Sequence, residues 1–187
     1  MQRHLLRSLK RSPILLVFTL LLALSDPLFA DVYYSKEEAL EIAFGKDSQV
    51  ESLPIFLTDQ QIAEIEKISQ TKLEGQLYTL FKGMKGDTLL GYAAIESQTV
   101  RTQAETLLVV LSPSGELVNV EVLAFHEPTE YKPQKLWLAK LFKRPVDQLR
   151  AHHGVDAISG ATLSVKSTLD QIRKVMAVYL VAVAGAP

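Results

Sequence analysis

Residues 104–125 contain the feature that most constrains the fold, a pair of apolar segments separated by a tight turn. The first segment, 104–111, ends in a run of apolar residues, and the second, 116–125, alternates apolar and polar residues. The sequence Ser112-Pro-Ser-Gly115 between them is typical of a turn. Alternation with a period of two is the pattern of a strand with one buried face. We therefore predict an antiparallel hairpin whose first strand lies in the interior of a sheet.

The segments around this hairpin predict further strands and helices. Two more strands are expected at 76–82 and 89–100, joined by a turn at 83–87. Short helical segments are expected at 134–142 and at 145–151, where Pro145 suits a first helical position. Trp137, Leu138 and Phe142 are interpreted as core residues of the first of these. The predicted fold class is α+β, a single domain with an antiparallel sheet covered by helices.

Two capping-box sequences predict helices before the first of these strands. One begins at Ser35 and is followed by an apolar run that stops at Gly45, and the other begins at Thr58 and predicts a helix over roughly 59–70. Segment 46–57 between them is expected to be a loop. The role of these helices, as a cap on the domain or as a docking surface, stays open at this point.

The last predicted element is an amphipathic helix over residues 165–183. Its apolar residues recur at steps of three and four: Val165, Leu169, Ile172, Met176, Tyr179 and Val183. Most charged residues fall on the other side: Lys166, Asp170, Arg173 and Lys174. Thr162 therefore lies just before this helix or in its first turn.

Thr162 occupies a position that suits an anion. The first turn of a helix has backbone N–H groups without partners, and the helix dipole attracts negative charge to that end. A hydroxyl here is well placed to hold a phosphate or to be esterified by one. The same pattern also fits an ordinary N-cap, in which the hydroxyl accepts a backbone hydrogen bond.

The sequence Asp156-Ala-Ile-Ser-Gly-Ala-Thr-Leu-Ser164 resembles the signature of the FMN-binding domain family. This family includes the flavin-carrying subunits of the sodium-translocating NADH:quinone reductase and of the Rnf complexes, and the resemblance covers about 104–178. It implies FMN joined through a phosphoester to the hydroxyl of Thr162. It also implies that Asp156 aids attachment, that Ser159 and Ser164 lie near the phosphate, and that Gly160 and Ala161 allow close approach of the backbone.

A second loop, residues 126–131, corresponds in position to the Glu-Thr-Pro-Gly-Leu-Gly loop that lies against the flavin ring in this family. Here the order is Glu127-Pro128-Thr129 and no glycine follows. The resemblance makes Glu127 and Thr129 candidate ring contacts and Tyr131 a candidate replacement surface. His153 is a further candidate for positioning the phosphate or ring.

Residues 1–30 resemble a secretory signal peptide. Basic residues at Arg3, Arg7, Lys10 and Arg11 precede a short apolar run at 14–24, and the segment ends at Ala30. The run is shorter than the ~20 apolar residues that a membrane span needs. We expect cleavage after Ala30 and export to a bacterial periplasm, with an uncleaved inner-membrane anchor as the alternative. The rest divides into an N-terminal helical segment, 31–75, and an FMN-binding domain, 76–187.

Charge and composition limit the chemistry of the chain. Removal of residues 1–30 would leave a net charge of −4, which argues against a nucleic-acid partner. The chain has no cysteine, so disulfides, thiol chemistry and cysteine-ligated iron–sulfur clusters are excluded. Any redox chemistry must come from an organic cofactor or from a metal held by nitrogen and oxygen ligands.

Three functional hypotheses follow. The leading one is an exported electron carrier, rather than a stand-alone enzyme, in which a separate flavin transferase attaches FMN and redox partner proteins, membrane-bound ones included, exchange electrons with it. The second is a sensory or ligand-binding module of the same fold that binds flavin reversibly or not at all. The third is a periplasmic metal-binding domain that uses His126, Glu127, His152 and His153.

Overall fold

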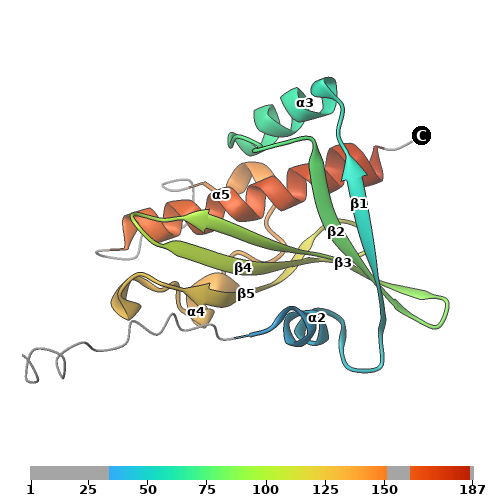
Figure 1. Ribbon diagram of the computed structural model, residues 1–187, viewed down its shortest axis with the longest axis horizontal. Helices are drawn as coiled ribbons and strands as arrows, with labels where there is room; N and C mark the ends of the chain where they lie inside the picture. Colours follow the sequence, from blue (N-terminus) through green and yellow to red (C-terminus); the bar gives the residue numbers. More distant parts are fainter. Residues whose placement is uncertain (1–33, 151–160, 186–187) are drawn as a thin grey trace, which may run out of the picture.

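The computed structural model describes residues 34–150 and 161–185 of the 187-residue chain. They form a five-stranded antiparallel sheet with helices on both faces (Figure 1). The strands follow one another across the sheet in chain order: β1 (Gln49–Phe56), β2 (Leu77–Lys85), β3 (Thr88–Thr99), β4 (Ala104–Leu111) and β5 (Leu117–Phe125). The α+β class is confirmed. The interior position predicted for residues 104–111 is also confirmed, because β4 is hydrogen-bonded to a strand on each side.

Both N-terminal helices begin with the capping boxes that the sequence predicted. At the start of α2 (Lys36–Phe44), the backbone N–H of Ser35 donates to the Glu38 carboxylate at 2.7 Å. The backbone N–H of Glu38 donates in return to the Ser35 hydroxyl at 3.2 Å. The helix ends at Gly45, whose φ of 86° favours glycine. A second capping box, at Thr58, starts α3 (Asp59–Ser69).

The prediction of a loop at 46–57 is wrong, because most of this segment is strand β1. It pairs with β2 along its whole length, with Pro54 opposite Thr79. Since β1 is at the edge of the sheet, a residue without a backbone N–H is tolerated there. Most of its side chains are exposed, so the segment lacks the alternating apolar pattern by which a strand is recognised.

Bulges explain two further departures from the sequence pattern. Strand β2 continues to Lys85, past the predicted end at 82, and its pairing with β3 shifts register between Gly83 and Met84. A second shift, where β4 pairs with β5, leaves Val118 without an opposite residue and 38% exposed. A bulge inserts one extra residue, so the side chains beyond it change face relative to a regular alternation.

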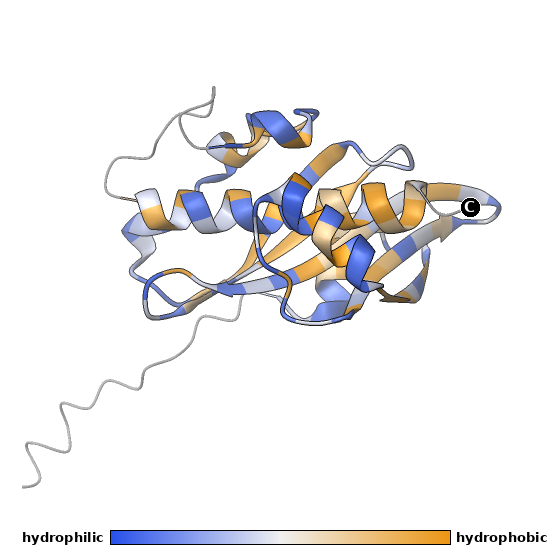
Figure 2. Ribbon diagram, turned by 90° about the horizontal axis from the view of Figure 1, so that it is seen from above, coloured by the Kyte–Doolittle hydropathy of each residue, from blue (hydrophilic) through white to orange (hydrophobic). Residues whose placement is uncertain are grey.

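Helix α5 (Thr162–Tyr179) is the centre of the molecule. It lies across one face of the sheet, and α3 and a short 3₁₀ helix (Val146–Gln148) cover its other side (Figure 1). Its last turns are mostly hydrophobic, whereas hydrophobic and hydrophilic residues alternate over the turns before them (Figure 2). Five of the six predicted apolar positions are buried, and the sixth is half-buried: Val165, Leu169, Ile172, Met176, Tyr179 and Val183.

Two of the charged residues on the other side of this helix, Asp170 and Arg173, are buried, with 6% exposure each. The Arg173 guanidinium donates to the backbone carbonyls of Ser69 and Leu149, at 2.7 Å each, and to the Asp170 carboxylate. These bonds connect α5 to the end of α3 and to the segment that follows the 3₁₀ helix. The charges are buried because a second layer covers a face that periodicity alone would leave in water.

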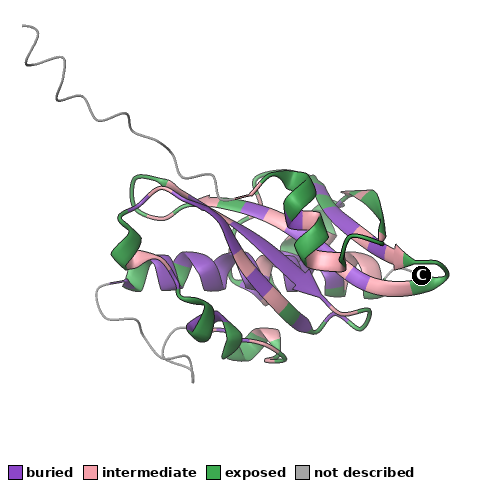
Figure 3. Ribbon diagram, turned by 90° about the horizontal axis from the view of Figure 1, so that it is seen from below, coloured by how far each residue is buried: buried purple, intermediate pink, exposed green. Residues whose placement is uncertain are grey.

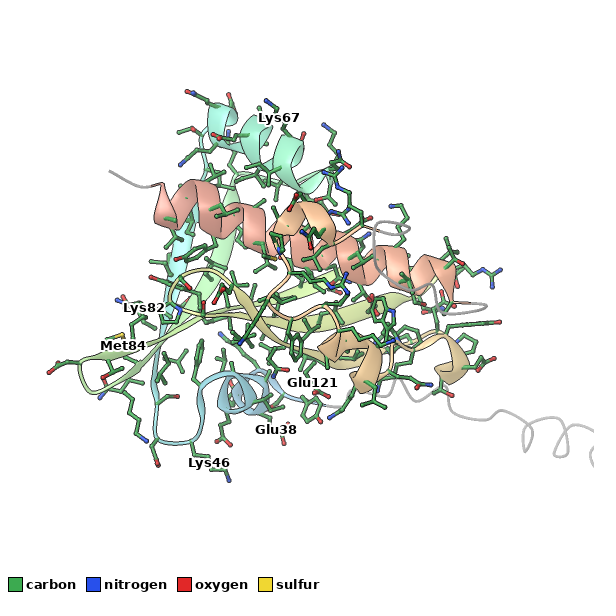
Figure 4. The ribbon with its side chains drawn as sticks, turned by 180° about the vertical axis from the view of Figure 1, so that it is seen from behind. Glu38, Lys46, Lys67, Lys82, Met84 and Glu121 are labelled. Carbon is green, nitrogen blue, oxygen red and sulfur yellow. The ribbon has the colours of Figure 1, made fainter. Side chains whose placement is uncertain are left out.

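The opposite face of the sheet is covered mainly by α2. Apolar side chains there form a smaller cluster under the helix: Ala39, Phe81, Ala93, Leu108, Val110 and Leu123. Strand β4 is buried on both faces for most of its length (Figure 3). Glu38 on α2 and Glu121 on β5 mark this side, and Lys67 on α3 marks the far side beyond α5 (Figure 4).

The segment after β5 is less helical than predicted. Helix α4 spans only Lys135–Ala139, and Pro145 precedes a single 3₁₀ turn instead of starting a longer helix. Trp137 and Leu138 are buried, as predicted for core residues, and Phe142 packs against the same core. Within residues 34–150 and 161–185, no helix combines the length and the hydrophobicity required to cross a membrane.

Candidate functional site

Three segments that are distant in sequence meet at the start of α5 and enclose a pocket of about 240 Å³. They are the connection between β3 and β4, the segment after β5, and the first residues of the helix. The lining residues are Val100, Arg101, Glu127, Tyr131, Ala161, Thr162, Leu163 and Ser164. The fold therefore brings the predicted attachment residue together with two residues of the loop that was expected to contact a flavin ring.

Thr162 is the first residue of α5, and its side chain is exposed at the pocket. The N-cap is Ala161, with φ −111° and ψ 29°, and no side chain caps the helix. The Thr162 hydroxyl forms no hydrogen bond with another described residue, so it does not serve as the ordinary N-cap considered above. The first turn of α5 thus offers backbone N–H groups and a hydroxyl together, which suits a phosphate.

Glu127 shapes the pocket through its carboxylate. The backbone N–H groups of Thr102 and Gln103 donate to it at 2.8 and 3.0 Å. These bonds, the one from Thr102 first, lower the pKa of Glu127 and keep it ionised. The carboxylate therefore holds the β3–β4 connection against the end of β5, where the backbone N–H of His126 also donates to Ala104 at 3.1 Å.

Arg101 is the pocket residue that the sequence did not single out. It is exposed in the β3–β4 connection and lines the pocket beside Thr162. A guanidinium close to a helix start favours a bound phosphate. The only signal in the sequence was one basic residue in the connection between two predicted strands, which is too common to assign a role.

Other candidates are placed elsewhere or are not described. Thr129 begins a 3₁₀ helix (Thr129–Tyr131) and lines a neighbouring cavity of about 320 Å³ beside α4. Asp156, Ser159, Gly160 and His153 lie outside the described residues. The histidine pair of the metal hypothesis lies there too, and the described part of the chain contains no group of three or more potential metal ligands. The metal hypothesis therefore stays a prediction.

A stripe of buried polar side chains runs along α5 from the pocket. Ser164, Ser167, Thr168 and Gln171 are each at most 3% exposed, and on the facing strand β4 Glu105 is fully buried. The Thr168 hydroxyl donates to the Glu105 carboxylate at 3.2 Å, and the Gln171 amide donates at 3.1 Å. Burial raises the pKa of Glu105 to about 7, and the hydrogen bonds from α5 act in the opposite direction.

The fold and the pocket together define an α+β domain in which the hydroxyl at the start of a helix has no partner among the described residues. The family model for FMN-binding domains matches residues 102–177, which include β4, β5, most of α5 and most of the pocket lining. The match identifies an FMN-binding domain within this part of the chain. No curated protein matches the chain.

The described lining fits the phosphate end of FMN. It provides a helix start without a side-chain cap and an arginine, which can both bind phosphate oxygens, and a hydroxyl, which can form the ester. The pocket is smaller than the roughly 300–1,000 Å³ that is usual for sites of drug-sized ligands. It is therefore sized for only part of the cofactor.

Proposed function

We propose that this chain is an exported electron-transfer protein that carries FMN covalently, through a phosphoester to Thr162, and relays electrons between redox partner proteins. One observation supports it above all: the Thr162 hydroxyl is exposed, bound to no other described residue and located in the pocket at the start of α5. The family match supplies the identity of the ligand.

Attachment by a flavin transferase uses this hydroxyl as the nucleophile. With FAD as the donor, the Thr162 oxygen forms a bond to the flavin-side phosphorus, AMP leaves with the bridging oxygen, and the hydroxyl proton is lost. Arg101 and the N–H groups of the first turn would stabilise negative charge on the phosphate during this step. Magnesium, which the resemblance implies for the transferase, would belong to that enzyme.

The rest of the domain holds the attachment point in place. Val165 and Leu169, 2% and 1% exposed, anchor the first turns of α5 in the core, so Thr162 is presented at a fixed position. The flavin supplies the electron-transfer chemistry, and the protein sets its surroundings. Covalent attachment suits a protein exported through the segment 1–30, because a dissociated cofactor would be diluted outside the cytoplasm.

Intact-mass measurement tests the attachment. The protein is coexpressed with a flavin transferase and compared with Thr162→Ala, Thr162→Ser and the control Thr88→Ala, an exposed threonine at the start of β3. We expect the wild type, Thr162→Ser and Thr88→Ala to gain the mass of FMN less one water and to fluoresce after denaturation. Thr162→Ala should show neither.

Two results would contradict the proposal. A mass gain that persists in Thr162→Ala would place the ester on another residue. Flavin that binds the wild type but leaves on denaturation would favour the reversible flavin-binding module instead. Export is tested separately, by N-terminal sequencing of the protein from the periplasmic fraction, which should begin at Asp31.

A further inference from the structure

Glu105 is a buried carboxyl group that the proposed attachment does not use. It lies on β4 beneath α5 and is fully buried. Its hydrogen-bond partners are neutral, and no lysine or arginine of the described residues forms an ion pair with it. Burial without an opposite charge raises the free energy of the ionised carboxylate, so the group takes up a proton more readily.

The charged groups on the surrounding elements are already engaged. Around Glu105 on β3 and α5, acids pair with bases or a phenol: Glu96 with Lys174 and Tyr78, and Asp170 with Lys166 and Arg173. On β5 the residue opposite Glu105 is Phe125, and beyond it the Glu127 carboxylate binds the β3–β4 connection. Among the described residues, Glu105 is therefore the ionisable group of this region whose charge has no counter-ion.

Residues with hydroxyl groups lie on the face of α5 between this carboxyl and the pocket. Ser164 lines the pocket and is 2% exposed, and Ser167 and Thr168 follow it by one helical turn. Side chains three and four residues apart on a helix are neighbours, with about 5–6 Å between their Cβ atoms. The Thr168 hydroxyl then contacts Glu105 at 3.2 Å. The carboxyl thus lies roughly 10 Å from the pocket, along a line of hydroxyls on one helix face.

A protonated Glu105 also has an acceptor close by. The Gln171 side-chain oxygen is buried and has no hydrogen-bond partner among the described residues, although its nitrogen contacts the carboxylate. Rotation of this amide would turn the free oxygen toward Glu105. The site can therefore satisfy both protonation states, donating to the carboxylate or accepting from the acid.

We propose that Glu105 is the proton-binding residue coupled to the flavin site, and that it takes up one proton when an electron arrives there. This inference rests on the function proposed above. The electron comes from a one-electron donor protein. One proton from solvent forms an O–H bond with a carboxylate oxygen of Glu105. The net charge of the region is unchanged, and removal of the electron by an acceptor releases the proton.

The expected coupling is measurable. At roughly 10 Å and an effective dielectric constant of about 20, one added negative charge shifts the pKa of a carboxyl upward by on the order of one unit. Because burial already raises the pKa of Glu105 to about 7, the shift falls close to neutral pH. Proton uptake by Glu105 should therefore accompany reduction mainly between about pH 7 and pH 8.

The test compares the reduction potential of the flavin-loaded protein, as a function of pH, with that of Glu105→Gln. The control is Glu116→Gln, an exposed glutamate of the same hairpin. Over the whole titration, from well below pH 7 to well above pH 8, the wild-type potential should fall further than that of Glu105→Gln, by about tenfold in the equilibrium constant, which is about 59 mV for one electron. Glu116→Gln should follow the wild type.

Infrared difference spectra, reduced minus oxidised, provide a second readout that does not depend on electron-transfer activity. At pH 7.5 the wild type should gain a protonated-carboxyl band that Glu105→Gln lacks. Parallel potential curves, or a band that persists in Glu105→Gln, would overturn the role of Glu105 while flavin remains attached. A wild type without flavin would overturn the proposed function itself, and this inference with it.

Discussion

Replacing Glu105 by glutamine should make the protein more stable at alkaline pH. The pKa of Glu105 is about 7 in the folded state, because burial disfavours the charged form, and about 4.3 in an unfolded chain. The folded state therefore binds this proton more tightly than the unfolded state does. The contribution of the Glu105 carboxyl to stability is most favourable below about pH 4.3 and is lost as the pH rises toward 7.

The magnitude follows from the difference between the two pKa values. Each unit corresponds to about 1.4 kcal/mol, so ionising Glu105 costs the folded state roughly 4 kcal/mol at pH values well above 7. Glutamine has nearly the same shape, can still accept from Thr168 and carries no charge. Glu105→Gln should therefore gain roughly 3 kcal/mol of unfolding free energy, relative to the wild type, between pH 4.5 and pH 8.

Urea denaturation of the flavin-free protein at several pH values measures this gain. Fluorescence of Trp137, the single tryptophan of the chain and a buried one, reports unfolding. The control Glu116→Gln changes an exposed glutamate and should give a difference from the wild type that does not vary with pH. If the difference for Glu105→Gln is equally flat from pH 4.5 to 8, the carboxyl is not held in an unfavourable ionised state and the reasoning fails.

Two other substitutions test the packing that positions the site. Arg173→Leu should lower the unfolding free energy by about 3–5 kcal/mol, because it removes one partner of a buried ion pair and the donor to two buried carbonyls. The midpoint of urea denaturation measures this loss. An equal loss in Lys67→Leu, a substitution at an exposed residue, would contradict the explanation. Gly115→Ala should lower the melting temperature, because its φ is +84° and a Cβ there would lie 2.1 Å from the Tyr179 ring. Gly86→Ala, with a φ of +56° and open space around it, separates backbone strain from this clash.

The parts of the fold with strong local signals were predictable. The capping boxes at Ser35 and Thr58 start helices because both hydrogen bonds of each box form within four residues. The hairpin of β4 and β5 is specified by its alternation and its turn. The apolar stripe of α5 is buried as its spacing requires. In each case the residues that determine the structure are neighbours in the sequence.

What could not be predicted depends on contacts between distant segments. Strand β1 is an edge strand with few buried side chains, and it is fixed by pairing with β2. The burial of Asp170 and Arg173 depends on the carbonyls of Ser69 and Leu149, which the fold brings beside α5. The same holds for Arg101, because its position beside Thr162 follows from the closure of the sheet against the helix.

The buried charged residues on α5 differ from the one on β4 in whether an opposite charge compensates them. The Asp170–Arg173 pair is compensated, since each charge meets an opposite charge and the remaining donors find carbonyls. Glu105 has only neutral partners among the described residues, and a glutamine in its place would avoid the cost of its ionisation. Natural domains are stable by only about 5–15 kcal/mol, so roughly 4 kcal/mol is a large share. The cost falls on a strand residue that contacts Thr168, one helical turn after Ser164 of the pocket lining, so the proposed proton binding explains it better than packing does.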